Sequence, residues 1–295
     1  MPGAVGRSPA APCALCGAQG GLQLSHLIPK FVFKHASQRS PTGYLRTTAV
    51  PNRRSQDGPK DYLLCSECEQ RFSRWENSFA HVFKLNHDKP GQTFTYSSDD
   101  ALAALSIVWR VLAMSREHRE IQHLELGSDY SRTDDAFEAW KRVLLGQQEN
   151  PGVFRLNWVW FNYVHPQDGV PEGINRYIFH ASDFDVWASK SQSFVIAHIP
   201  GVFIIGATES FERSGFRGFD VSLRGGRYVA TEGKVAPIWL KQYIEEKIAV
   251  RDAAIKQMTP AQKKKISDDV LKDPEKALKS SMFRSILADY GHQDG

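Results

Sequence analysis

The sequence predicts an α+β fold in two parts, and three observations lead to that prediction. The only four cysteines occur as two Cys-x-x-Cys pairs within the first 68 residues. Apolar residues recur at helical spacing over residues 65–89 and 237–256. Between these segments, short runs of β-branched and aromatic residues indicate strands. We therefore expect a small metal-stabilised domain followed by a larger mixed α+β domain.

The two cysteine pairs predict a zinc site. Cys13 and Cys16 are separated from Cys65 and Cys68 by 48 residues, and this arrangement is typical of two knuckles around one tetrahedral ion. The alternative is two unrelated redox-active or buried pairs. Gly17 after the first pair and a helical pattern after the second favour the zinc site. Four thiolates would fill the tetrahedral coordination shell of the ion.

Composition places the chain among soluble globular proteins, with 41% apolar and 24% charged residues. No apolar run is long enough to cross a bilayer, because the best candidate, residues 194–207, is interrupted by His198 and Pro200. The residues before Cys13 contain no apolar segment of the kind found in a signal peptide. We expect a cytoplasmic protein.

The chain divides into three segments on these patterns. Residues 1–12 are rich in Pro, Ala and Gly and are predicted to be a disordered lead-in. Residues 13–91 form the zinc domain, in which a strand over residues 22–26 ends before Pro29 and a helix from Cys65 ends at Pro90. Residues 92–97 are predicted to be a connection. Residues 97–295 form the α+β domain, which we expect to fold without the first.

The larger domain is predicted to begin with two helices, over residues 98–114 and 134–145. Strands follow, and a hairpin turn is predicted at residues 198–201. A further helix is predicted to begin at Pro260 behind a Thr259 cap. The predicted strands cover residues 156–163, 177–180, 194–198, 202–205 and 227–230.

Residues 13–85 resemble an HNH endonuclease domain of the zinc-knuckle, ββα-metal type, which is also described as treble-clef-like. The resemblance rests on the cysteine pairs together with the segment Leu-Ser-His-Leu-Ile-Pro at residues 24–29 and the segment Leu-Leu-Cys-Ser-Glu-Cys-Glu at residues 63–69. It covers about a quarter of the chain and implies a metal-dependent nuclease. It does not extend to the larger domain.

The resemblance assigns His26 as the general base that takes a proton from the attacking water. Histidine suits this role because its side chain ordinarily titrates near pH 6.5. The alternative is a histidine with a purely structural role. A catalytic Mg²⁺ or Mn²⁺ is also implied, with Glu69 and Asp61 as the expected ligands, and Asp57 and Glu76 are further candidates. Ser25 departs from the family, which commonly has a metal-binding residue there.

Nucleic acid, most simply DNA, is the partner that these features imply. Residues 1–96 hold 12 Lys or Arg and 6 Asp or Glu, a net charge of +6, whereas the remaining residues carry −2. Such an excess favours polyanions, although it is also compatible with an ordinary solvated surface. The basic residues expected to hold phosphates are Arg46, Arg53, Arg54, Lys60 and Arg71.

Two functions are therefore open from the sequence. One is a metal-dependent endonuclease that hydrolyses phosphodiester bonds with His26 as the base. The other is a zinc-stabilised nucleic-acid-binding or interaction module that derives from the same fold and does not cleave, and Ser25 favours it. The position of carboxylates around His26 distinguishes the two.

Overall fold

A computed structural model describes residues 7–55, 57–117, 131–166, 170–188, 193–208, 215–230 and 234–291. The strands are β1 (Leu22–His26), β2 (Lys60–Cys65), β3 (Phe94–Tyr96), β4 (Leu156–Trp160), β5 (Asp183–Ala188), β6 (Ser193–Ile199), β7 (Val202–Ala207) and β8 (Gly226–Tyr228). The helices are α1 (Lys30–Arg39), α2 (Ser66–Asp88), α3 (Ser98–Glu117), α4 (Ser131–Leu144), α5 (Ile174–His180), α7 (Ile238–Lys256), α8 (Pro260–Leu271), α9 (Pro274–Leu278) and α10 (Ser281–Asp289).

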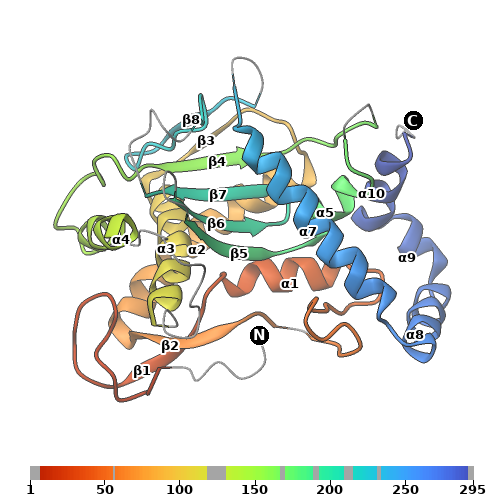
Figure 1. The fold of residues 1–295 in the computed structure, drawn as a ribbon, viewed down its shortest axis with the longest axis horizontal. Coiled ribbons are helices and arrows are strands. Elements are labelled where there is room, and N and C mark those ends of the chain that lie inside the picture. The colour runs from red at the N-terminus through yellow and green to blue at the C-terminus, as the bar shows by residue number, and fades with distance from the viewer. Residues whose placement is uncertain are drawn as a thin grey trace.

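A four-stranded antiparallel sheet with the order β4-β7-β6-β5 lies at the centre of the fold (Figure 1). Both faces of the sheet are covered. Alternate residues of β6 face opposite ways, so that Val195 and Ala197 join the core under α3, whereas Phe194 and Ile196 join the core under α7. Every residue of β6 and β7 is buried, as expected for strands between two helical layers. The α+β class is therefore confirmed.

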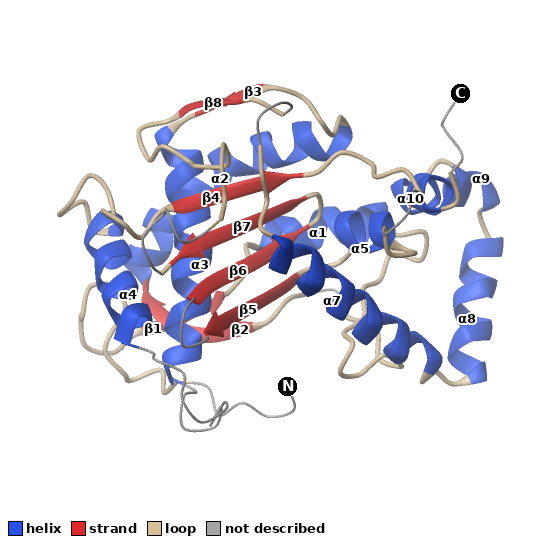
Figure 2. Ribbon diagram, turned by 45° about the horizontal axis from the view of Figure 1, so that its top comes forward, coloured by secondary structure: helices blue, strands red, loops and turns tan. Residues whose placement is uncertain are grey.

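The N-terminal segment forms a β-hairpin-like pair followed by a long helix. β1 and β2 pair antiparallel, and α2 begins directly after β2 and packs against α3 behind the central sheet (Figure 2). The buried side chains of α2, among them Phe72, Phe79 and Phe83, recur at spacings of three, four or seven residues, which places them on one face of the helix. The helix ends at Asp88, just before Pro90, as the sequence predicts.

One apolar core crosses the predicted domain boundary. Phe72 of α2 packs edge-on against Trp109 of α3, with ring centroids 6.1 Å apart, and Phe79 lies 5.6 Å from Trp158 of β4. The connection predicted at residues 92–97 contains β3, which pairs with β8 of the larger segment. The two segments are thus continuous in their packing.

Two local predictions differ from the structure. Residues 177–180 are predicted as a strand but belong to helix α5, which begins after Gly173 in the left-handed conformation (φ 76°). Asn175 at the start of this helix is buried and donates through its side chain and main chain to Asp289 of α10, so a tertiary contact outweighs the strand preference of Tyr-Ile-Phe. Helix α1 is the second difference, because the sequence predicts no helix between Pro29 and Cys65.

Helices α8, α9 and α10 form a C-terminal arm at the edge of the molecule (Figure 1). Thr259 caps α8 by accepting from the amide of Gln262, as the sequence predicts. At the other end of the chain, residues 1–6 of the predicted lead-in lie outside the described part, whereas Arg7 donates its amide to Asp61 of β2 at 3.0 Å. Among the described residues, no helix combines the length and apolarity that crossing a membrane requires.

Candidate functional site

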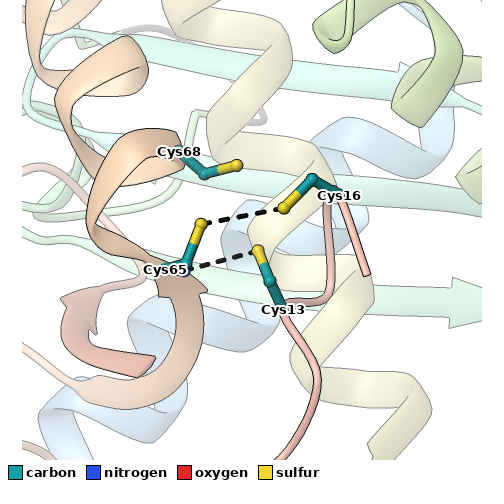
Figure 3. A group of neighbouring side chains, drawn as sticks. All are labelled: Cys13, Cys16, Cys65 and Cys68. Carbon is teal, nitrogen blue, oxygen red and sulfur yellow. Dashed lines mark hydrogen bonds between the residues drawn. The ribbon is translucent and has the colours of Figure 1, made fainter. Parts of the chain in front are cut away.

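The four cysteines meet between the first knuckle and the start of α2 (Figure 3). Their sulfur atoms all lie within 4.8 Å of one another, and Cys16 Sγ is 3.7 Å from Cys65 Sγ. A tetrahedral ion with metal–sulfur distances of about 2.3 Å would hold its ligands about 3.8 Å apart. The thiols are free and form no disulfide. The donor set therefore fits a four-coordinate metal ion.

Main-chain geometry favours the thiolate of Cys13, whereas burial raises the pKa of Cys16 and of Cys68. Gly17 takes a positive φ of 77°, which allows the chain to turn so that its amide donates to the carbonyl of Cys13 at 2.9 Å. The amide of Cys65 donates to Cys13 Sγ at 3.3 Å. Burial alone would raise the pKa of Cys13, but amide donors from Cys16, Cys65 and Leu15 outweigh it and lower the pKa to about 7. A readily formed thiolate is the form that binds a metal.

His26 lies at the other end of the hairpin from the cysteines. Strand pairing sets Leu22 opposite Cys65 and His26 opposite Lys60, so four residues, about 13 Å, separate the two ends. The His26 side chain is 17% exposed and therefore reaches the surface. Its ring lies beside that of Phe33 on α1, with centroids 6.4 Å apart.

Asp57 is the carboxylate that the structure brings to His26. Nε2 of His26 donates to Asp57 Oδ1 at 2.6 Å, and Lys60 Nζ lies 2.5 Å from Asp57 Oδ2. Partial burial acts to raise the pKa of Asp57, but donors on Lys60, His26 and the Gly58 amide lower it well below its usual range. Asp57 is therefore a carboxylate at neutral pH, and both of its oxygens are engaged.

The other expected cation ligands do not gather at His26. Residues directly opposite each other in the hairpin share a face, so Asp61 points with the buried Ser25 to the face away from His26. Glu69 directly follows Cys68 in the first turn of α2, about 10 Å along the helix from Glu76. Glu76 Oε1 accepts from Arg110 Nη2 at 2.6 Å.

A catalytic Mg²⁺ or Mn²⁺ thus finds no ready set of ligands in this arrangement. Within the described ranges, the cysteine cluster is the only group of three or more His, Cys, Asp or Glu residues close enough to share an ion. Asp57 would have to release Lys60 before it could bind a cation.

Comparison with protein-family models, with curated proteins and with solved structures found no match to this chain. The site is therefore interpreted from its own geometry.

The basic residues expected to hold phosphates fall into three places. Lys60 lies at His26, as described above. Arg71, on α2, donates to the carbonyl of Leu144 at 3.0 Å and borders a shallow hollow with Arg74, on the side of α2 turned away from Glu76.

Arg46, Arg53 and Arg54 lie in the loop between α1 and β2, which folds back on itself through a bridge between Leu45 and Ser55. Arg53 is exposed. Arg54 packs over the ring of Tyr44 at 4.3 Å and forms an ion pair with Asp269 of α8.

Arg110 contacts His26, and it is a residue that reasoning from the sequence does not identify. It lies in the middle of α3, whose residues from Ala101 to Ala113 are otherwise apolar except for Ser106. Its guanidinium is buried and reaches both His26 and Glu76. A single arginine in an apolar helix was the available signal, because such a residue is rarely buried without a specific partner.

Proposed function

We propose that the protein is a nuclease that hydrolyses phosphodiester bonds, with His26 as the general base. The observation that carries the proposal is the 2.6 Å hydrogen bond between His26 Nε2 and Asp57 Oδ1 at the surface end of the hairpin. A histidine oriented by a carboxylate is a common arrangement for a general base. The likeness of residues 13–85 to HNH endonucleases supports the same assignment.

The carboxylate of Asp57 selects the tautomer of His26. Because the Asp57 carboxylate accepts a hydrogen bond from Nε2–H, the neutral ring carries its lone pair on Nδ1. Nδ1 is then the atom that removes a proton from water, the water oxygen attacks phosphorus, and the bond from phosphorus to the leaving oxygen breaks. Lys60, which pairs with Asp57 beside the ring, is the proposed contact with the phosphate.

The metal at the four cysteines is, in this proposal, a structural Zn²⁺. Four thiolates fill a tetrahedral shell and leave no position for water or substrate. The ion would join the first knuckle to the start of α2 and so hold β1 and β2 as part of a ββα-metal unit. DNA is the proposed substrate, and Arg46, Arg53 and Arg54 are the proposed phosphate contacts.

A binding module that does not cleave is the second candidate. The dispersal of Glu69, Asp61 and Glu76 around the hairpin favours it, because the family resemblance implies a divalent ion next to the base. In this case the pair of His26 and Asp57 has only a structural role. Nucleic acid is then bound by the basic loop alone, which is the loop between α1 and β2 that contains Arg46, Arg53 and Arg54.

The two candidates are separated by a plasmid-nicking assay on the full chain with Mg²⁺, Mn²⁺ or EDTA. We expect cleavage by the wild type and a loss of at least about 100-fold in Asp57→Asn, since an amide no longer fixes the tautomer of His26. Undiminished cleavage by Asp57→Asn would reject the proposed pair, and an inactive wild type under all conditions would favour the binding module. Loss of cleavage in Glu69→Gln would return Glu69 to the site.

A further inference from the structure

The buried guanidinium of Arg110 connects α3 to the end of β1. Arg110 is 1% exposed, and its Nη1 donates to the main-chain carbonyl of His26 at 2.7 Å. Nη2 donates to Glu76 Oε1 at 2.6 Å. Nε donates to the carbonyl of Ser106, one turn back on the same helix, at 3.3 Å. These three acceptors therefore fix the orientation of the guanidinium group.

The hydrogen bond from Arg110 fixes the carbonyl side of the peptide bond between His26 and Leu27. The amide of Leu27, on the other side of the same peptide bond, donates to the carbonyl of Pro59 at 3.1 Å. Both polar groups of the His26–Leu27 peptide are thus held, one by α3 and one by the residue before β2. The orientation of this plane sets the backbone at His26 and with it the direction in which the ring leaves the chain.

Stability alone does not account for this arrangement. Burying the guanidinium of Arg110 costs free energy in desolvation, and apolar residues of similar volume often serve a core equally well. An arginine, however, can donate to two acceptors in fixed directions at once, which neither an apolar residue nor a lysine does. The geometry fits a role in placing His26.

We propose that Arg110 is a positioning residue for His26, so that α3 of the larger segment is part of the nuclease site. The proposal rests on the function proposed above. Glu76, in this account, is the counter-ion that keeps Arg110 in place. His26 alone is then not enough for catalysis, because its ring contacts Asp57 only while Arg110 holds the end of β1.

The test separates positioning from stability with paired variants of the full chain. Arg110→Met leaves the partly buried Glu76 unpaired, so we expect a lower Tm. Adding Glu76→Met removes the unpaired charge and should restore Tm without restoring the bond to His26. Arg116→Met, on the same helix and also ion-paired, is the matched control. Arg110→Gln, whose side chain is too short to reach the carbonyl, replaces Arg110→Met if that variant does not fold.

Two readouts follow His26 in each variant. Nitrogen NMR of the ring should show proton on Nε2 in the wild type and in Arg116→Met, and a mixture of tautomers in Arg110→Met with Glu76→Met. The kcat for cleavage should fall about 10- to 100-fold in the double variant, with KM nearly unchanged.

A double variant that is stable, has the wild-type tautomer and cleaves at the wild-type rate would overturn the proposal. If the wild type does not cleave, the nuclease assignment fails. The NMR readout still decides whether Arg110 positions the ring.

Discussion

At the scale of single residues, the buried histidines give the clearest dependence of stability on pH. Burial, together with the neighbouring His35, whose ring lies 4.4 Å away, lowers the pKa of His87 to about 2. In the unfolded chain a histidine titrates near pH 6.5. The unfolded state therefore binds the proton first as the pH falls, so the stabilisation is complete above about pH 7 and is lost below it.

We expect His87→Phe to make the protein less sensitive to acid. Between pH 7 and pH 5, one such histidine accounts for a loss of about 2 kcal/mol in the free energy of unfolding. Phenylalanine fits among the rings of Phe83 and Phe179 and does not titrate. Urea denaturation at pH 7, 6 and 5 measures the slope, with His81→Ala on the exposed side of α2 as the control. Equal slopes in all three proteins would contradict this account.

At the scale of elements, the strongest sequence signals are chemical and local. The cysteine spacing, the strand before Pro29 and the helix between Cys65 and Pro90 are all found where the sequence places them. These features depend on residues that determine local geometry. Helix α5 and the neighbours of His26 depend instead on contacts between distant segments. Asp289 reaches α5, and Arg110 reaches β1, across 84 residues or more, and such pairs leave no periodic pattern in one sequence.

The zinc ion proposed at the four cysteines leads to a prediction for the hairpin and α2 together. Cys65→Ser should lose the bound metal and unfold this part of the chain, because a hydroxyl is a poor zinc ligand and metal binding is coupled to folding. Elemental analysis and circular dichroism of the purified variant measure both effects. Ser66→Ala, at the first residue of α2, is the control. Purified wild type without zinc would contradict the assignment.

The C-terminal arm makes a second prediction at this scale. Asp269 of α8 pairs with Arg54, and the amide of Thr259 donates to Asn52 at 2.9 Å, so the arm rests on the basic loop. No residue of α8 is buried, which leaves these polar contacts to hold it.

Asp269→Asn should free Arg54 and tighten binding to duplex DNA several-fold, with a salt dependence steeper by about one ion. Titration of labelled duplex at 50–200 mM salt measures this. Asp268→Asn removes the same charge from the same helix and is the control, because Asp268 pairs with Lys264 and, among the described residues, with no arginine of the basic loop. An identical effect of the two changes would show that general charge, and not the contact with Arg54, is responsible.

At the scale of the whole molecule, the shared core makes the two segments depend on each other. Without residues 1–96, Trp109 loses Phe72 and Trp158 loses Phe79. We therefore expect a fragment of residues 97–295 to lack cooperative unfolding, unlike the independent domain that the sequence predicts. Tryptophan fluorescence during urea denaturation of this fragment measures it. A sharp transition with a stability near that of the full chain would support separate domains.

The proposed role of His26 as a general base held by Asp57 is tested by comparing His26→Ala with the wild type. Cleavage of plasmid DNA and affinity for a labelled duplex are measured on the same preparations, with His81→Ala as the control. The account predicts a loss of about 100- to 10,000-fold in cleavage rate with nearly unchanged affinity, because the proton acceptor is removed while the arginines and lysines remain. Cleavage by purified His26→Ala at the wild-type rate would contradict it.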